Sequence, residues 1–192
     1  MLKKALLSTF LALPLTSCVS FGAEPPDQLM TLTPARSAPA GAATTAPANA
    51  ALAVLEPAAS QRLDVTRVPV QTSDSSLAYL KEAVWVEKPA RLFQALLVET
   101  IRAKGNRLVV REEDLGQSAV ATLSGRLLDM GYDVATGGVV VRFDGVLQRA
   151  DGQVQTRRFE SRVPAAPEAA AVAPALNQAA NEVADQVAEW VG

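Results

Sequence analysis

The sequence has no histidine and only one cysteine, Cys18, among its 192 residues. Without histidine the chain cannot form a Ser-His-Asp or Cys-His catalytic pair, and it has no imidazole ligand for a metal. A single cysteine cannot close an internal disulfide or supply the several thiolates of a structural zinc site. These absences exclude most hydrolase and metalloenzyme classes, and we predict a non-enzymatic protein that holds no cofactor and no metal.

An excess of positive charge is also missing. The chain has 18 Lys+Arg against 20 Asp+Glu, a net charge of −2, which argues against a nucleic-acid partner because such binding depends on Lys and Arg neutralising phosphates. It contains no Gly-rich phosphate loop, no paired-carboxylate motif and no nucleophile elbow. The sequence therefore carries no recognisable catalytic or phosphate-binding motif.

The apolar run near the amino terminus, Ala5–Leu15, is interrupted by two hydroxyl residues and a proline. It is too short to cross a bilayer, which requires about 20 apolar residues. Lys3 and Lys4 precede it and small residues follow it, as in a secretory signal peptide. We predict that residues 1–17 are a signal peptide that is removed after export.

The segment Leu15-Thr16-Ser17-Cys18 resembles the lipobox of bacterial lipoproteins, with an aliphatic residue three positions before the cysteine and small residues between them. The resemblance implies a thioether-linked diacylglycerol on Cys18, cleavage before Cys18 and an acyl chain on the new amino terminus. The alternative is an ordinary signal peptide with a coincidental cysteine. A chain modified in this way is anchored to a membrane without spanning it.

Val19 follows the lipidated position. In enteric bacteria an Asp at this position commonly retains a lipoprotein in the inner membrane, so Val19 favours the outer membrane by analogy. We predict a lipid-anchored protein of the Gram-negative envelope that faces the periplasm from the outer membrane.

The mature chain is predicted to comprise a lipidated tether, residues 18–28, and one domain, residues 29–192. The run from Leu29 to Thr33 has the composition of a weak strand. Between Ala35 and Ala53, ten of nineteen residues are Ala, and such a segment buries too little apolar surface to offset its ordering entropy. We predict a flexible Ala/Pro-rich loop at about residues 35–50.

Two amphipathic helices are predicted from apolar residues that recur with helical spacing. The first begins at Pro89 and ends at Gly105, a typical helix stop. The second begins at about Glu168 or later, since Pro174 lies near its start, and ends at Val191. Their apolar faces are predicted to carry Leu92, Phe93, Leu96, Leu97, Thr100 and Ile101 in the first, and Val172, Leu176, Val183, Val187 and Trp190 in the second.

The remaining segments alternate apolar and polar residues as strands do. A change of phase beside Gly125 predicts a β-bulge, and turns are predicted at Gly137-Gly138 and Asp151-Gly152. The fold class is therefore α+β, a mainly antiparallel or mixed sheet with two long amphipathic helices packed on one side. The extended segments are 51–55, 63–70, 77–80 with 83–86 as a hairpin or one bent strand, 108–110, 119–134, 139–148 and 155–163.

Three groups of residues could form a site. Five arginines could bind an anion or a lipid headgroup, but the solvated face of a sheet, balanced by nearby acids, is the favoured interpretation. Glu112-Glu113-Asp114 lacks the spacing of a calcium site and is interpreted as a solvated turn. Trp85 and Trp190 could line a groove but more often such residues complete a core. The arginines are Arg142, Arg149, Arg157, Arg158 and Arg162, and the balancing acids are Asp144, Asp151 and Glu160.

Taken together, the mature segments resemble the ABC-type transport auxiliary lipoproteins, which are encoded with MCE-domain lipid transporters and include the paraquat-inducible type. The resemblance rests on the lipobox, on the order of elements, and on a Leu-Asp-plus-Arg strand that precedes a Trp and a long helix. Here these residues are Leu63-Asp64-Val65-Thr66-Arg67 and Trp85-Val86-Glu87-Lys88-Pro89, with a similar closing Ala-Asp-Gln-Val-Ala-Glu-Trp-Val.

The resemblance implies a non-catalytic lipoprotein that docks with an MCE-domain protein and an ABC permease complex. Its transport system would move phospholipid or other apolar cargo between the inner and outer membranes. Members of the family can self-associate, so the resemblance also allows a homo-oligomer. The alternative is a structural or assembly lipoprotein of another envelope machine, such as a secretin pilot.

Overall fold

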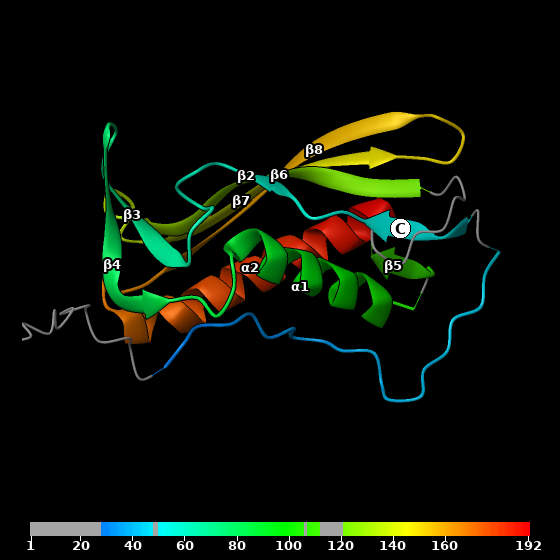
Figure 1. Cartoon of the computed structure of the whole chain (residues 1–192), viewed down its shortest axis with the longest axis horizontal. Coiled ribbons are helices and arrows are strands. Elements are labelled where there is room, and N and C mark those ends of the chain that lie inside the picture. Colours follow the sequence, from blue (N-terminus) through cyan, green and yellow to red (C-terminus); the bar gives the residue numbers. More distant parts are fainter. Residues whose placement is uncertain (1–27, 48–49, 106, 112–120) are drawn as a thin grey trace, which may run out of the picture.

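The computed structural model describes residues 28–47, 50–105, 107–111 and 121–192. Within these residues the chain forms an eight-stranded mixed sheet and two helices that lie against the same face of it (Figure 1). This arrangement confirms the predicted α+β class. The elements are β1 Leu52–Val54, β2 Ala58–Ala59, β3 Arg67–Ser73, β4 Ser76–Val84, α1 Pro89–Ala103, β5 Val109–Arg111, β6 Ala121–Asp133, β7 Gly138–Gln148, β8 Val154–Pro164 and α2 Ala169–Val191.

Three long antiparallel strands, β6, β7 and β8, form a meander through the turns predicted at Gly137-Gly138 and Asp151-Gly152, with β8 at the edge of the sheet. Leu123 of β6 pairs with Leu147 of β7, and Phe143 of β7 pairs with Phe159 of β8. Successive side chains of a strand point to opposite faces. On β7 the apolar residues at alternate positions are therefore buried under the helices, while Arg142 lies on the opposite face.

The other edge of β6 is paired by three short strands in succession, each running parallel to it. Leu52 of β1 pairs with Ala121, Ala58 of β2 with Arg126, and Val70 of β3 with Tyr132. β4 extends this side as the antiparallel partner of β3, and β5 pairs with β1. β6 is thus the strand on which the whole sheet is assembled.

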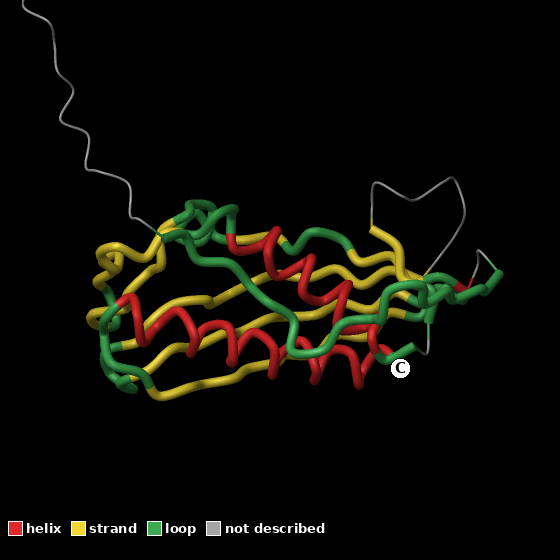
Figure 2. Tube along the Cα trace, turned by 90° about the horizontal axis from the view of Figure 1, so that it is seen from below, coloured by secondary structure: helices red, strands yellow, loops and turns green. Residues whose placement is uncertain are grey.

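Both helices bury the faces that the sequence predicted. α1 starts with Pro89 at its first turn and is followed by Gly105, which has a φ of +72°. α2 starts at Ala169 and contains Pro174 within its first turns, so the regular helix begins before the proline. Figure 2 shows the two helices lying across the strands on one face.

A chain of aromatic rings joins the helices to the sheet. The Phe93 ring of α1 lies 5.4 Å from that of Phe143, Phe143 lies 6.3 Å from Phe159, and Phe159 lies 5.4 Å from Trp190 of α2. Such ring pairs contribute beyond the area that they bury. The aromatic contacts fix the depth at which both helices sit on β7 and β8.

The segment before β1 runs over the two helices (Figure 2). On α2, Asn181 accepts a hydrogen bond from the Ala35 amide (2.7 Å) and donates one to the Thr33 carbonyl (3.0 Å). On α1, Glu99 accepts one from the Ala38 amide (2.8 Å). The Ala/Pro-rich segment therefore starts on the helical side of the domain, while the flexibility predicted for 35–50 stays a prediction.

Two local predictions differ from the structure. Residues 63–66 form turns and bends, and β3 starts only at Arg67, because the amides of Leu63 and Asp64 donate back to the Ser60 carbonyl and close a turn. Of the strand predicted at 29–33, only Met30 forms a β-bridge, with Trp85. For 77–80 and 83–86 the prediction left open a hairpin or one bent strand, and the structure has one bent strand, residues 76–84, in which Glu82 has a φ of +59°.

The predicted change of phase in β6 exists, but the bulge lies at Leu128 and not beside Gly125. The register between β6 and β7 shifts between Leu127 and Asp129, so Leu127 and Met130 both face the core. Gly125 has a different role. It has a φ of +152°, and a Cβ there would lie 2.1 Å from the Asp144 carbonyl oxygen.

We predict that Gly125→Ala lowers the free energy of unfolding by roughly 3 kcal/mol or more, because the added methyl overlaps backbone and the Phe143 ring in a packed interior. Gly137→Ala is the matched control, since its φ of +64° is also positive but no atom lies within 4 Å of its Cβ position. The control should cost only about 1 kcal/mol. Urea unfolding of both variants checks this, and equal losses would contradict the close packing at Gly125.

Candidate functional site

Two groups of predicted site residues lie outside the described residues. These are Cys18, the predicted lipid attachment site, and the acidic run Glu112-Glu113-Asp114. The other groups, the arginines and the two tryptophans, can be placed. Three of the arginines, Arg142, Arg158 and Arg162, define the candidate site because they lie on the same face of the sheet.

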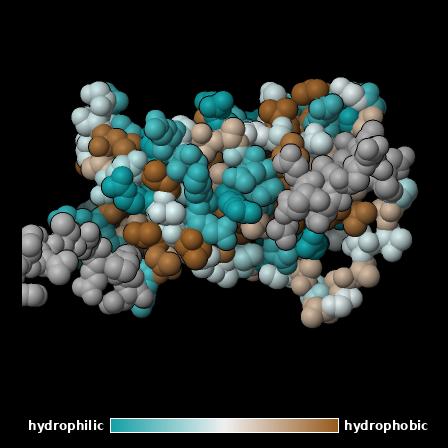
Figure 3. All heavy atoms as spheres, viewed as in Figure 1, coloured by the Kyte–Doolittle hydropathy of each residue, from teal (hydrophilic) through white to brown (hydrophobic). Residues whose placement is uncertain are grey.

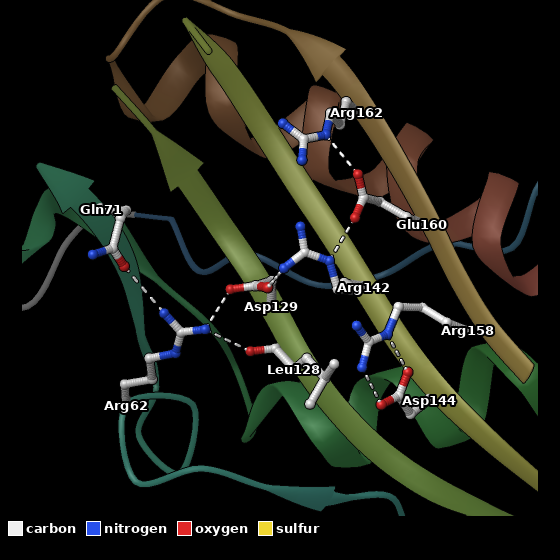
Figure 4. A network of polar contacts seen from close by, with 9 residues as sticks. All are labelled: Arg62, Gln71, Leu128, Asp129, Arg142, Asp144, Arg158, Glu160 and Arg162. Atoms are coloured by element: carbon white, nitrogen blue, oxygen red, sulfur yellow. Dashed lines mark hydrogen bonds and ion pairs between the residues drawn. The ribbon is translucent and has the colours of Figure 1, made fainter. Parts of the chain in front are cut away.

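A network of charged side chains covers the face of the sheet opposite the helices (Figure 4). Arg142 of β7 lies at its centre, between one acid on each neighbouring strand. Its Nη1 donates to Asp129 Oδ2 (2.6 Å) and its Nε donates to Glu160 Oε2 (2.5 Å). Arg142 is therefore bound from both sides by groups of opposite charge.

The strand register produces these contacts. Arg142 is paired in register with Asp129 on β6 and with Glu160 on β8. Two residues further along β7, Asp144 is paired with Arg158. The Arg158 guanidinium donates two hydrogen bonds to Asp144 (2.6 and 2.7 Å). Opposite charges on directly facing residues stabilise a sheet modestly. The network is thus a cross-strand ladder of charges.

Arg62 connects this ladder to the turn that precedes β3. Its guanidinium forms an ion pair with Asp129 and donates to the Leu128 carbonyl (2.7 Å) and to Gln71 (3.2 Å). Together with parts of β3, β6 and β7, these residues line a polar surface hollow of about 360 Å³. Each arginine of the network, Arg62, Arg142, Arg158 and Arg162, thus has an acidic partner.

Two acids of the network, Asp144 and Glu160, are held in their ionised forms. The Arg158 guanidinium, through its hydrogen bonds, keeps the pKa of Asp144 below its ordinary value. Hydrogen bonds from Arg162 and then from Arg142 lower the pKa of Glu160 in the same way. A general acid or base requires a pKa near the working pH. These carboxylates are therefore suited to fixing charges in place and not to transferring protons.

Two of the five predicted arginines do not join the network. Arg157 lies over the Phe159 ring, 5.2 Å from its centre. Burial of the Arg107 guanidinium lowers its pKa, and the positive charge of Arg149 nearby lowers it further. The favoured interpretation of the arginines as a charge-balanced sheet face therefore holds for Arg142, Arg158 and Arg162.

Arg62 and Asp129 were missed by the sequence reasoning. They are 67 residues apart, and no local pattern joins them. The only available signal was the phase change in β6, because a bulge at Leu128 turns Asp129 to the outer face and leaves a carbonyl free. Locating that bulge requires the pairing with β7.

The two tryptophans belong to the packed interior more than to a groove. Trp85 is 1% exposed, and its Nε1 has no hydrogen-bond partner among the described residues. Trp190 is partly buried against Phe159. Among the described residues, no group of three or more acids, histidines or cysteines is placed to hold a metal. None of the described helices combines the length and apolarity that crossing a membrane requires.

We predict that Arg142→Ala lowers the free energy of unfolding by about 1–2 kcal/mol, because it leaves Asp129 and Glu160 without their shared cation. Arg158→Ala is the control, since Arg158 pairs with one acid and is more exposed. It should cost less, because exposed ion pairs contribute little. Denaturant unfolding at neutral pH measures both, and a larger loss in the control would contradict the central role of Arg142.

The chain matches one protein family, and its fold is similar to solved structures. The family model described as "ABC-type transport auxiliary lipoprotein component" matches residues 31–188. Among curated proteins, none matches the chain. A crystal structure of an uncharacterized protein superposes with a TM-score of 0.64 at 20% identity, covering 75% of this chain and 93% of that one. The crystal structure of protein XCC0632 from Xanthomonas campestris gives 0.61 at 21% identity, covering 86% and 92%.

At these identities the two crystal structures show a shared fold and nothing more. The family model, by contrast, covers most of the chain, from the segment beside Met30 to the last turn of α2. The protein therefore belongs to the family of ABC-type transport auxiliary lipoprotein components.

Proposed function

We propose that the protein is a non-catalytic lipoprotein, attached to the outer membrane through Cys18 and facing the periplasm. In this proposal it serves an MCE-associated ABC transport system that moves phospholipid or other apolar cargo between the two membranes. The observation that carries the proposal is the family match over residues 31–188 directly behind a lipobox that ends at Cys18.

The lipid anchor supplies membrane attachment in this proposal. Each buried methylene of an acyl chain contributes about 0.8 kcal/mol, so two or three chains hold a protein stably where one would be marginal. The segment that connects Cys18 to the folded domain is short. Met30 is already fixed to β4, because its amide donates to the Val84 carbonyl (2.7 Å). The anchor therefore keeps the domain close to the bilayer.

The domain itself is suited to docking. Asp144 and Glu160 in its charge network are held ionised by their arginine partners, and charges fixed in this manner favour specificity in binding more than affinity. The partners we propose are an MCE-domain protein and an ABC permease complex, with ATP hydrolysis supplied by a separate subunit. A homo-oligomer would fit the same role, since several copies could then engage one transport complex.

We predict that Cys18→Ala abolishes acylation and releases the protein from the outer-membrane fraction, because Cys18 carries the only thiol in the chain. Fractionation of the envelope and mass spectrometry of the amino-terminal peptide measure the two effects. A thiol-reactive dye gives an independent readout, since the wild-type mature protein should not label after denaturation if its sulfur is in a thioether.

Val19→Asp is the matched variant for this experiment. It should remain acylated but shift toward the inner membrane, if the position after the cysteine controls sorting. Normal outer-membrane fractionation of Cys18→Ala would overturn the proposed anchor. A labelled thiol on the wild-type mature protein would overturn it as well.

We predict that the wild-type protein, isolated from a mildly solubilised envelope, recovers an MCE-domain subunit and the ABC permease. The control is a fusion of residues 1–28 to an unrelated soluble domain, which carries the same anchor without the described fold. Subunits recovered with the fusion would show co-solubilised membrane and not docking. Recovery of secretin or outer-membrane assembly subunits in place of the transporter would overturn the proposed partner.

A further inference from the structure

The anchored segment enters the domain at one defined point. Met30 forms a bridge with Trp85, with its amide donating to the Val84 carbonyl (2.7 Å) and its carbonyl accepting from the Val86 amide (2.9 Å). Met30 is twelve residues beyond Cys18, and twelve residues span at most about 40 Å when fully extended. If Cys18 is anchored, the end of the domain that holds Met30 lies within that distance of the bilayer.

Exposed aliphatic side chains lie at this same point. In the bridge, Leu29 lies opposite Val84, and side chains alternate along paired chains. Met30 and Trp85 face the core, so Leu29, Val84 and Val86 share the outward side. Leu29 is 53% exposed and Val86 is 49% exposed. We call Leu29, Val84 and Val86 the tether-side cluster, and Figure 3 shows hydrophobic atoms gathered at this end of the molecule.

Two cations next to the tether-side cluster are paired with acids, and a third, Arg67, which is paired in register with Val84, lies over the Tyr79 ring. Lys88 Nζ lies 2.8 Å from Asp64 Oδ1, and Arg91 Nε lies 3.6 Å from Glu87 Oε2. The cluster is therefore not the centre of a basic patch of the kind that attracts anionic lipid. Any contact with a bilayer at this point would depend on its aliphatic side chains.

We propose that the tether-side cluster inserts into the headgroup region of the bilayer to which Cys18 is anchored, and thereby orients the domain. This inference rests on the proposed lipid anchor. Three aliphatic side chains are too few to bind a membrane on their own, but the anchor makes the contact intramolecular and supplies a high effective concentration. We assign the bilayer as the occupant because the tether keeps the Met30 end of the domain within about 40 Å of it.

The orientation has a structural consequence. β4 lies at one end of the molecule, and the turn between β7 and β8 lies at the other (Figure 1). β7 has eleven residues and spans about 36 Å at the usual rise of a strand. With the tether-side cluster on the membrane, the long strands carry the β7–β8 turn and Val154, which is 60% exposed, away from it.

Site-specific photocrosslinking tests this orientation. The photoreactive residue benzoylphenylalanine replaces Val86 in one variant and Val154 in the other, because both are exposed valines at opposite ends of the domain. Each mature lipoprotein is reconstituted in vesicles of phosphatidylethanolamine with a minority of phosphatidylglycerol. We expect about tenfold more lipid adduct at position 86 than at position 154, because only the first is held at the headgroups.

Two further measurements define the contact. Leu29→Asp, combined with the probe at position 86, should reduce the lipid adduct severalfold, while Val154→Asp should leave it unchanged. Vesicles of phosphatidylcholine alone, or a high salt concentration, should also leave it unchanged because the contact is not electrostatic. Equal adducts at positions 86 and 154, or an adduct at 86 to a second copy of the chain in place of lipid, would overturn the proposal.

A separate arm distinguishes this inference from the proposed anchor. The whole chain is coupled through its single thiol, Cys18, to a maleimide-bearing phospholipid and then added to the same vesicles. If the natural protein proves not to be acylated, the proposed function fails, but the coupled chain still reports the orientation. If acylation is confirmed and the coupled chain shows no preference for position 86, only the orientation is refuted.

Discussion

The bulge at Leu128 in β6 is the constraint on which both faces of the sheet depend. A strand of thirteen residues with strict alternation could not place Leu123, Leu127, Met130 and Tyr132 on one side, yet all four are buried. One extra residue corrects the phase, and it does so without loss of pairing on either side of it. The same displacement turns Asp129 outward toward Arg142 and leaves the Leu128 carbonyl to accept from Arg62. Core packing and the surface charge ladder are thus set by one local feature.

Most of the local structure could be predicted because its signals are local. The meander follows from alternation and from Gly-containing turns, and α1 follows from a helical apolar face between Pro89 and Gly105. The parallel pairing of β1, β2 and β3 with β6 could not be predicted, because these contacts join segments about sixty residues or more apart and the short strands carry little pattern of their own. The turn at 63–66 was missed for a similar reason, since the burial of Leu63 is decided by the strands around it.

The candidate site likewise combines residues that a local pattern predicts with residues that only the tertiary structure brings together. Three of the five arginines were correctly interpreted as a balanced sheet face, because the acids that neutralise them lie on the same or the next strand. Arg62 could not be found, because its partners are brought to it by tertiary structure alone. Cys18 is the opposite case. Its role is predicted entirely from four adjacent residues, and enzymes of lipoprotein maturation recognise such a motif in an extended chain, so the fold adds nothing to that prediction.

The fold also separates two kinds of surface that would interfere with each other. The charge ladder occupies the face opposite the helices (Figure 4), while exposed aliphatic side chains lie at the end of β4, where the tether enters. Burying ionised groups such as Asp144 or Glu160 against lipid would carry a large desolvation cost. Because the ladder lies on the sheet face away from the helices, and the chain beyond Met30 runs over the helices, the proposed bilayer contact through Leu29 and Val86 would leave these groups in water. If the proposed anchor holds the domain at the bilayer, the same geometry leaves the charged face open to a partner.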